Sequence, residues 1–314
     1  MSSSLNILKF FDKYQTKLKL SFLSSETGLT REIQTSRRNN DSFEAVDYFN
    51  VIRTSSIVVV GFHESRYISR LSEYEQISLM KRLFRGPVSV IIVSHNNVLP
   101  AAMISLCEAK EIAVLKSDLP DSEIIDLSRH LLTNALAETT IEHGVYIEVY
   151  SLGVFITGNS GVGKSELALA MISRGHRLIS DDVTRFARVS PDVIDGRSPG
   201  LICDFMEVRG LGVVNIRSMF GANALKLRKT LRLIVHMERL TKENSTSFDR
   251  LGNNIKTRNI LGVDIPEVVL PVAPGRNLAV LVEAAARNHL LNLSGYNAAE
   301  DFIERQNRLI QDQQ

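Results

Sequence analysis

The stretch at residues 153–172, GVFITGNSGVGKSELALAMI, decides the fold of the carboxyl-terminal part of this chain. A short apolar run leads into GNSGVGKS at 158–165, and residues that favour a helix follow it. Strand, GxxxxGKS loop and helix in this order are the context in which such a loop binds phosphate. The alternative is that the glycines only form a turn, and the correct flanking segments argue against it. The sequence therefore predicts an α/β domain that binds a polyphosphate with Mg²⁺.

The residue types of the loop have separate physical roles. The glycines let the backbone turn, so that consecutive N–H groups and the helix N-terminus cradle phosphate oxygens. Lys164 adds positive charge at the terminal phosphates, and the Ser165 hydroxyl can ligate Mg²⁺. The predicted nucleotide-binding residues are Gly158, Asn159, Ser160, Gly161, Val162, Gly163, Lys164 and Ser165.

The length and composition indicate a globular protein with room for two domains. The chain has 314 residues, 44% of them apolar, and 37 Lys and Arg against 35 Asp and Glu. This balance gives no overall field that would attract nucleic acid or an anionic membrane. Cys107 and Cys203 lie far apart and show no disulfide or metal-ligand pattern. With no signal-peptide pattern and no apolar run near the ~20 residues needed to cross a bilayer, we expect a soluble, cytoplasmic protein.

The first part of the chain shows a pattern of alternating strands and helices. Residues 55–61 and 88–94 are short β-branched runs that predict buried strands, and 112–115 is a third. Residues 72–84 between them carry apolar residues at helical spacing. No motif in this part predicts a chemistry, so its role stays unassigned.

A longer helix is expected next. It runs over 122–141, with Ser122 as its N-cap, and ends at His143-Gly144. We place the domain boundary here, giving an amino-terminal α/β domain at 1–130 and a catalytic domain at 131–314.

Two adjacent carboxylates, Asp181 and Asp182, follow a short apolar run downstream of the loop. They are suited to hold Mg²⁺ or to accept a proton from an attacking hydroxyl. An isolated pair is more often a solvated turn or a helix cap, but a phosphate loop just upstream favours the functional interpretation. The residues alone do not decide which aspartate does which task.

Further candidates carry weaker signals. Glu207 and Arg209 lie among glycines and suit a metal and a phosphate, although such a segment is more often a surface turn. Arg250 and Arg276 lie in loop-like settings where a solvated cation is the alternative. His143, in the expected last helical turn, is explained by the helix dipole alone.

Six motifs in order carry a recognisable pattern: IEHGV at 141–145, GNSGVGKSE at 158–166, GHRLISDD at 175–182, MEVRGLGVVN at 206–215, DRLG at 249–252 and PVAPGR at 271–276. Together they closely resemble HPr kinase/phosphorylase, the bifunctional regulatory enzyme of sugar metabolism in Gram-positive bacteria. One departure is Asn159, where that family often has an acidic residue. This position contributes its backbone rather than its side chain to the loop, so we expect asparagine to be tolerated there.

The resemblance implies phosphorylation of a regulatory serine on the phosphocarrier protein HPr by ATP or pyrophosphate. It also implies the reverse task, in which inorganic phosphate attacks phosphoserine-HPr and yields pyrophosphate, and a role in carbon catabolite repression and sugar uptake. The implied catalytic residues are His143, Lys164, Asp182 and Arg250; the implied Mg²⁺ ligands are Ser165 and Glu207; the implied supporting residues are Asp181, Arg209 and Arg276.

The resemblance further implies a P-loop domain similar to phosphoenolpyruvate carboxykinase, followed by carboxyl-terminal helices, in a homohexamer. Residues 297–310 have the pattern of an amphipathic helix, which either caps its own domain or contacts neighbouring subunits and HPr. Two other interpretations stay open at this point. One is a different P-loop enzyme, such as a small-molecule kinase or a nucleotide-driven switch, and the other is a nucleotide sensor without turnover.

Overall fold

The computed structural model describes residues 5–33, 50–51, 56–200, 203–240 and 256–311, which form two compact units. The first unit ends at Ala137 and the second begins at Glu138. The boundary expected from the sequence, between residues 130 and 131, falls inside the last helix of the first unit, α5 (Asp121–Leu136).

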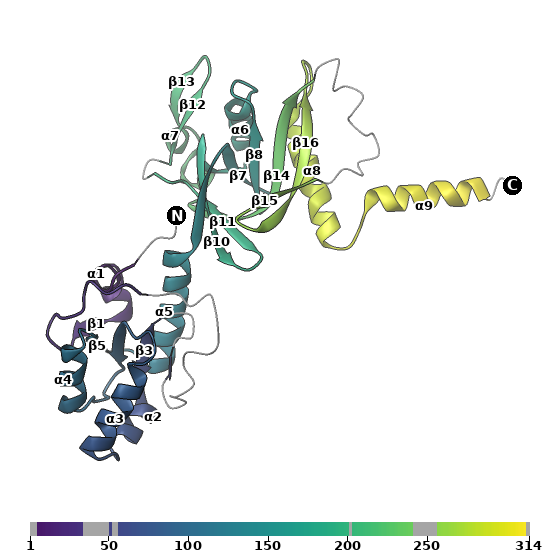
Figure 1. Ribbon diagram of the computed structural model, residues 1–314. Helices are drawn as coiled ribbons and strands as arrows, with labels where there is room; N and C mark the ends of the chain where they lie inside the picture. The colour runs from purple at the N-terminus through teal and green to yellow at the C-terminus, as the bar shows by residue number, and fades with distance from the viewer. Residues whose placement is uncertain (1–4, 34–49, 52–55, 201–202, 241–255, 312–314) are drawn as a thin grey trace. The chain divides into compact units, whose positions relative to one another are not determined.

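The first unit is a sheet with helices on both faces (Figure 1). Its strands are β1 (Leu20–Phe22), β2 (Asn50–Val51), β3 (Ile57–Val60), β4 (Val90–Val93) and β5 (Ala113–Ser117). Its other helices are α1 (Ile7–Leu18), α2 (Phe62–Ile68), α3 (Glu73–Leu83) and α4 (Ala101–Ala109). The strand order is β1-β5-β4-β3-β2, with β3, β4 and β5 parallel and the two edge strands antiparallel.

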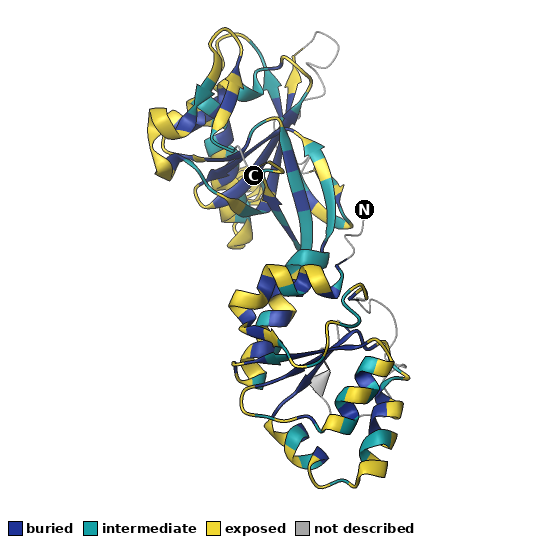
Figure 2. Ribbon diagram, turned by 90° about the vertical axis from the view of Figure 1, so that its left-hand side faces the viewer, coloured by how far each residue is buried: buried dark blue, intermediate teal, exposed yellow. Residues whose placement is uncertain are grey.

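The predicted strands and the predicted helix at 72–84 of this unit are confirmed. Every residue of β3 and β4 is buried, because α1 and α5 pack on one face of the sheet and α2, α3 and α4 on the other. Figure 2 shows these buried strands in dark blue between half-exposed helices. Ser72 caps α3 through a capping box with Glu75.

The expected helix over 122–141 was wrong at both ends. Its N-cap is Pro120 rather than Ser122, and the helix stops at Leu136. Residues 138–143 form strand β6 (Glu138–His143), which pairs antiparallel with β10 (Val183–Ser190). The β-branched run Thr139, Thr140 and Ile141 suits a strand. His143 therefore ends a strand, and the helix-dipole explanation for it does not apply.

The second unit is built on one large mixed sheet. The remaining strands of that sheet are β7 (Val145–Val149), β8 (Leu152–Gly158), β9 (Arg177–Ser180), β11 (Val193–Arg197), β14 (Arg228–Arg239), β15 (Lys256–Ile260) and β16 (Val263–Val272). A separate hairpin comprises β12 (Phe205–Val208) and β13 (Gly212–Asn215). The helices are α6 (Lys164–Ser173), α7 (Ile216–Phe220), α8 (Leu278–Leu293) and α9 (Ala298–Gln311), with a 3₁₀ turn at Ala222–Ala224.

The sheet order places the functional segments. Strands run in the order β6-β10-β11-β14-β8-β7-β9, and β16 pairs with both β14 and β15. β8, β14 and β16 are parallel neighbours, so their carboxyl ends lie at one edge of the sheet (Figure 1). In parallel α/β sheets ligands bind at this edge.

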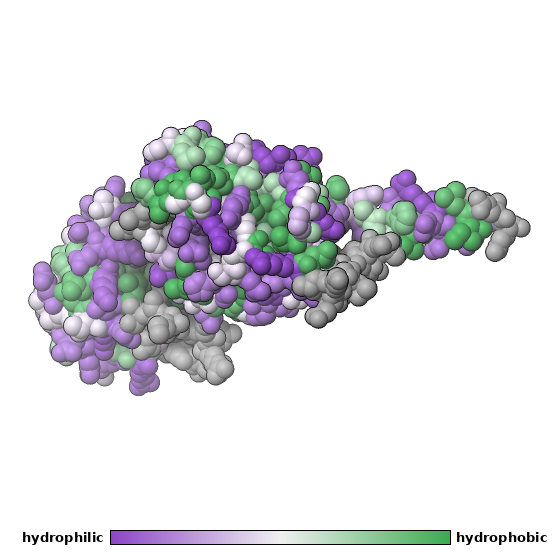
Figure 3. All heavy atoms as spheres, turned by 90° about the horizontal axis from the view of Figure 1, so that it is seen from above, coloured by the Kyte–Doolittle hydropathy of each residue, from purple (hydrophilic) through white to green (hydrophobic). Residues whose placement is uncertain are grey.

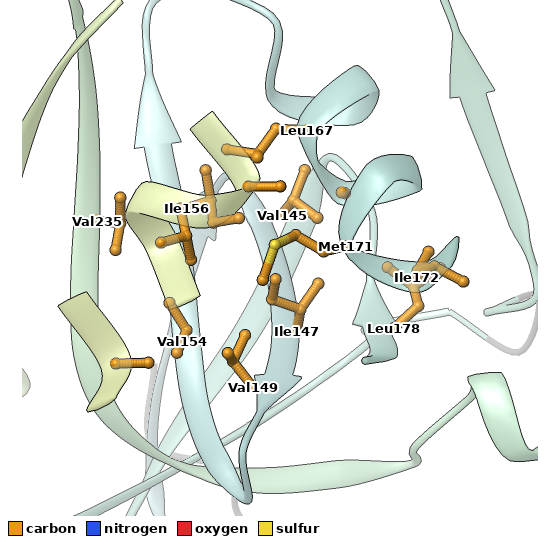
Figure 4. Close-up of a cluster of buried hydrophobic side chains, with 14 of the residues drawn as sticks. Val145, Ile147, Val149, Val154, Ile156, Leu167, Met171, Ile172, Leu178 and Val235 are labelled. Atoms are coloured by element: carbon orange, nitrogen blue, oxygen red, sulfur yellow. The ribbon is translucent and has the colours of Figure 1, made fainter. Parts of the chain in front are cut away.

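Two hydrophobic clusters hold the sheet. On one face, α6 and α8 pack on Val145, Ile147, Val154 and Ile156, and Met171 of α6 lies between the helix and these strands (Figure 4). The other face carries a second cluster, in which Tyr146, Phe155 and Phe186 meet edge to face. The phosphate loop therefore follows directly after β8, a strand that is buried on both faces.

An ion-pair network ties α8 to the end of α6. Arg174 donates two hydrogen bonds to the Glu283 carboxylate, at 2.7 and 2.6 Å, and His176 Nε2 lies 3.0 Å from the same carboxylate. The hydrogen bonds from Arg174, followed by that from His176, lower the pKa of Glu283 to about 2. Because the folded-state pKa lies below the unfolded value of about 4.3, the stabilisation is present above that pH and is lost as pH falls toward 2.

Glu283→Gln is expected to lower the free energy of unfolding at pH 7 by about 1–2 kcal/mol, since charge-assisted hydrogen bonds are lost from a half-exposed arginine. The difference from wild type should shrink as pH falls from 5 to 2, which denaturant unfolding at several pH values would measure. Glu304→Gln is the control, because its pair with Arg308 on α9 is exposed on both sides and should contribute under about 0.5 kcal/mol. A Glu283 effect that does not depend on pH would contradict the assignment.

Candidate active site

The phosphate loop has the geometry that its sequence predicts. β8 ends at Gly158 and α6 begins at Lys164. Gly158, Gly161 and Gly163 have φ values of 144°, 71° and 102°, in the region that favours glycine. A Cβ on Gly158 would lie 2.5 Å from the Met237 carbonyl oxygen of the neighbouring strand. The loop needs glycine there both for its backbone conformation and for space.

Lys164 reaches back into the loop. Its Nζ donates hydrogen bonds to the carbonyl oxygens of Gly158, at 2.9 Å, and of Asn159, at 3.2 Å. The ammonium group is therefore placed inside the loop, where phosphate oxygens of a polyphosphate would replace these carbonyl oxygens as its partners.

The two aspartates after β9 have different surroundings. Asp181 is half-buried, and its Oδ2 accepts a hydrogen bond of 3.1 Å from the Glu207 backbone N–H. Its Oδ1 is buried and has no hydrogen-bond partner among the described residues. Burial raises the pKa of the Asp181 carboxyl, and the Asp182 charge adds to this; the Glu207 N–H and the Ser165 hydroxyl oppose it. Asp181 is thus a partly satisfied carboxylate facing the end of the loop.

Asp182 is exposed and has a φ of 64°, a conformation uncommon outside glycine. Its carbonyl oxygen accepts a hydrogen bond of 2.8 Å from Gly144 N–H. Because β6 pairs with β10 so that His143 lies opposite Val183, the exposed His143 comes next to Asp182. Non-glycine residues held in this backbone region are concentrated at functional sites.

The β12–β13 hairpin brings its polar residues to the same place. Glu207 and Arg209 alternate with buried Met206 and Val208, so both side chains lie on the exposed face. A Cβ built on Gly161 would lie 3.8 Å from Arg209 Nη1, which places the guanidinium beside the phosphate loop. The structure therefore brings Lys164, Ser165, Asp181, Glu207 and Arg209 together. Glu207 and Arg209 carried only a weak signal in the sequence because it is the position of the hairpin in the fold that brings them to the loop.

Two further predicted residues have different outcomes. Arg250 lies outside the described residues. Arg276 is exposed after the end of β16, and in the described part of the chain no hydrogen bond links its side chain to the loop. Both remain predictions of the sequence.

The sequence interpretation missed Arg239, the last residue of β14. Its Nη2 donates a hydrogen bond of 2.8 Å to the Gly161 carbonyl oxygen. The available signal was a cation four residues after the short apolar run at 233–235. That signal became informative only once β14 was found beside β8.

A magnesium ion fits the donors that are present. Among the described residues no three His, Cys, Asp or Glu side chains gather into a cage. Mg²⁺ commonly uses one or two protein carboxylates and completes its shell with water and substrate phosphates. The unpartnered Oδ1 of Asp181, near the Ser165 hydroxyl and Glu207, suits this arrangement.

Within the described ranges, no helix is long and apolar enough to span a bilayer.

Comparison with known proteins identifies the family. A model described as "HPr Serine kinase C-terminal domain" matches residues 134–306, and one described as "HPr Serine kinase N terminus" matches residues 5–132. The HPr kinase/phosphorylase of Chromobacterium violaceum is 37% identical over 99% of this chain and 98% of its own length. That of Neisseria meningitidis is 39% identical over 96% of this chain and 94% of its own length.

The chain belongs to the HPr kinase/phosphorylase family. A solved structure from Coxiella burnetii, titled as the Hpr(Ser) kinase/phosphatase, is 31% identical and covers 52% of this chain and 98% of that chain, with a TM-score of 0.45. As a member of the HPr kinase/phosphorylase family, this chain is an enzyme, a kinase/phosphorylase that binds nucleotide. The predicted site residues all lie within residues 134–306, which the carboxyl-terminal model matches.

Asp181→Asn should have separate effects on the stability of the fold and on the binding of metal. Without metal, we expect the variant to be more stable than wild type, by on the order of 1 kcal/mol, because a half-buried and incompletely paired charge is removed. Mg²⁺ with pyrophosphate should raise the melting temperature of wild type but hardly that of the variant. Scanning calorimetry measures both effects, with Asp192→Asn in an exposed turn as the control. Equal stabilisation of all three proteins by Mg²⁺ and pyrophosphate would contradict the expectation that Asp181 helps to hold the metal.

Proposed function

We propose that this enzyme transfers the terminal phosphoryl group of ATP or pyrophosphate to a serine of HPr. We further propose that it catalyses the reverse process, in which inorganic phosphate attacks phosphoserine-HPr and pyrophosphate leaves. The names of the relatives and of both family models support HPr as the substrate. In the cell, such a reaction would control carbon catabolite repression and sugar uptake from the cytoplasm.

The observation that carries the proposal is the exposed Asp182, which directly follows Asp181, the carboxylate beside Ser165 of the phosphate loop. A serine on another protein must approach the donor from solvent, so the group that accepts its proton must be accessible. Asp182 is exposed, whereas Asp181 is half-buried against Ser165 and Glu207. This difference supports Asp182 as the proton acceptor and Asp181 as the residue that steadies the metal or orients its neighbour.

Proton movement at one carboxylate accounts for both directions. In the forward reaction, Asp182 takes the proton of the serine hydroxyl as its oxygen attacks the phosphoryl group. In reverse, the protonated Asp182 gives that proton to the leaving serine oxygen while phosphate attacks. Microscopic reversibility makes the base of one direction the acid of the other, so a second proton carrier is not needed. His143, beside Asp182, would contact phosphate or adjust the charge of its neighbours.

The remaining residues hold the phosphates and neutralise charge. Lys164 and Arg250 would meet the transferred group, and Arg209 the donor at the loop. Ser165 and Glu207 would hold Mg²⁺, which when bound supplies positive charge at the phosphate oxygens. Arg276 in PVAPGR would serve mainly the dephosphorylation reaction.

Helix α9 is proposed to contact other proteins. It has no buried residue, and Phe302, Ile303, Leu309 and Ile310 are exposed on it. In Figure 3 hydrophobic patches interrupt the hydrophilic surface of this helix. We propose that it packs against a neighbouring subunit of a homohexamer and receives HPr, because an amphipathic helix with an uncovered apolar side is a typical partner surface.

The test incubates the purified enzyme with HPr, Mg²⁺ and ATP or pyrophosphate and reads the intact mass of HPr. Inorganic phosphate is then added and pyrophosphate is assayed. A phosphate-sized gain on HPr that disappears as pyrophosphate appears is the expected result. If HPr stays unmodified while nucleotide binds, the enzyme acts on another substrate. If the phosphate leaves HPr as inorganic phosphate without pyrophosphate, the reverse reaction is hydrolysis rather than phosphorolysis.

A further inference from the structure

Strand β14 lies beside β8, and its carboxyl end reaches the level of the phosphate loop. It runs parallel to β8, with Met237 paired with Gly158, the residue at which β8 becomes the loop. β14 continues for two more residues, to Arg239, which pairs with Val272 of β16 on its other side. The Arg239 backbone is therefore fixed in the sheet, and its side chain starts level with the loop.

The Arg239 guanidinium fixes the apex of the loop. Its hydrogen bond of 2.8 Å goes to the carbonyl oxygen of Gly161. In a trans peptide the C=O and the following N–H point in opposite directions, so this contact also sets the direction of Val162 N–H. That N–H donates back across the loop to the Asn159 carbonyl oxygen, at 3.2 Å. One side chain from a rigid strand thus determines the shape of the turn between Asn159 and Val162.

Charge around the loop points to the same ligand class. Gly161 lies between Arg239 from β14 and Arg209 from the hairpin, while Lys164 lies inside the loop. These cations come from three separate elements. A polyphosphate, which carries several negative charges over a short length, is the class of ligand that such a set of cations attracts.

We propose that Arg239 is a further positioning residue of the reaction: it holds the loop apex in the shape that accepts the diphosphate shared by ATP and pyrophosphate. This proposal rests on the proposed donors. Because both donors place a diphosphate in the same loop, loss of Arg239 must weaken both by a similar factor. Turnover at saturating donor should change little, because Arg239 contacts the loop and not the reacting atoms.

The test measures dissociation constants of MgATP and of magnesium pyrophosphate by calorimetry, together with KM and kcat for HPr phosphorylation. Arg239→Met is expected to raise both dissociation constants and both KM values by about 10- to 100-fold, with kcat changing less than about threefold. Arg239→Lys should recover part of the affinity, since it keeps a charge and a donor without the planar fork. Arg228→Met, at the opposite end of β14 and exposed, is the matched control and should bind as wild type.

Because the dissociation constants of the donors are measured directly, this test does not depend on whether HPr is the substrate. Unchanged dissociation constants for both donors in Arg239→Met would overturn the proposal, and so would a loss for ATP alone. A lower kcat with unchanged donor affinity would also overturn it, because that pattern indicates a smaller folded fraction. If Arg239→Met does not fold, Arg239→Lys is measured in its place. Lysine lacks the planar guanidinium group, so wild-type donor affinity and KM in Arg239→Lys would then contradict the proposal.

Discussion

Replacing Lys164 with methionine is expected to reduce phosphoryl transfer to HPr by about 10³-fold or more. The ammonium group lies inside the phosphate loop, where it donates hydrogen bonds to the Gly158 and Asn159 carbonyl oxygens. Charge development on the transferred group is the main demand of phosphoryl transfer, and a fixed cation supplies several kcal/mol toward it. Methionine keeps a similar length and fills the same space without the charge. Initial rates with ATP and with pyrophosphate measure the effect.

The control for this variant is Lys81→Met, an exposed lysine on α3 of the first unit. It should leave rates within about twofold of wild type, since isolated surface charges contribute little. Thermal unfolding of Lys164→Met should match wild type closely. A Lys164→Met variant that is folded and retains a tenth of the activity would contradict the proposed role of Lys164 at the reacting phosphate.

Asp182→Asn is expected to reduce phosphorylation and phosphorolysis together by about 10²- to 10⁴-fold, the usual contribution of a positioned acid or base. Asparagine is the suitable replacement because Asp182 has a φ of 64°, a conformation that asparagine tolerates better than alanine does. The amide keeps the shape of the side chain but cannot carry the proton. HPr mass analysis follows the forward reaction, and pyrophosphate release follows the reverse one.

The matching variant is Asp181→Asn, which alters the neighbouring carboxylate. For Asp182→Asn, donor affinity should stay close to wild type, whereas Asp181→Asn should weaken Mg²⁺-dependent binding of the donor. If only one direction is lost in Asp182→Asn, two different groups carry the proton in the two directions. If Asp181→Asn gives the larger loss of kcat with intact metal binding, the two roles are exchanged.

Local sequence determined the phosphate loop. Gly158, Gly161 and Gly163 have the positive φ values that the loop requires, and the apolar runs on either side encode the strand and helix that aim it. In the first unit, the runs at 57–60 and 90–93 form buried parallel strands for the same reason. Such elements are predictable because their requirements are met within a few residues.

Only the tertiary structure decided how the rest of the site is arranged. Residues 138–143 form a strand because β10 offers them a partner, and this places His143 beside Asp182. Asp181 and Asp182 are chemically identical in the sequence, and burial against Ser165 and Glu207 makes them different. Arg239 gained its place from the parallel pairing of β14 with β8. These contacts join residues far apart in the chain, so their energies depend on packing that no local pattern contains.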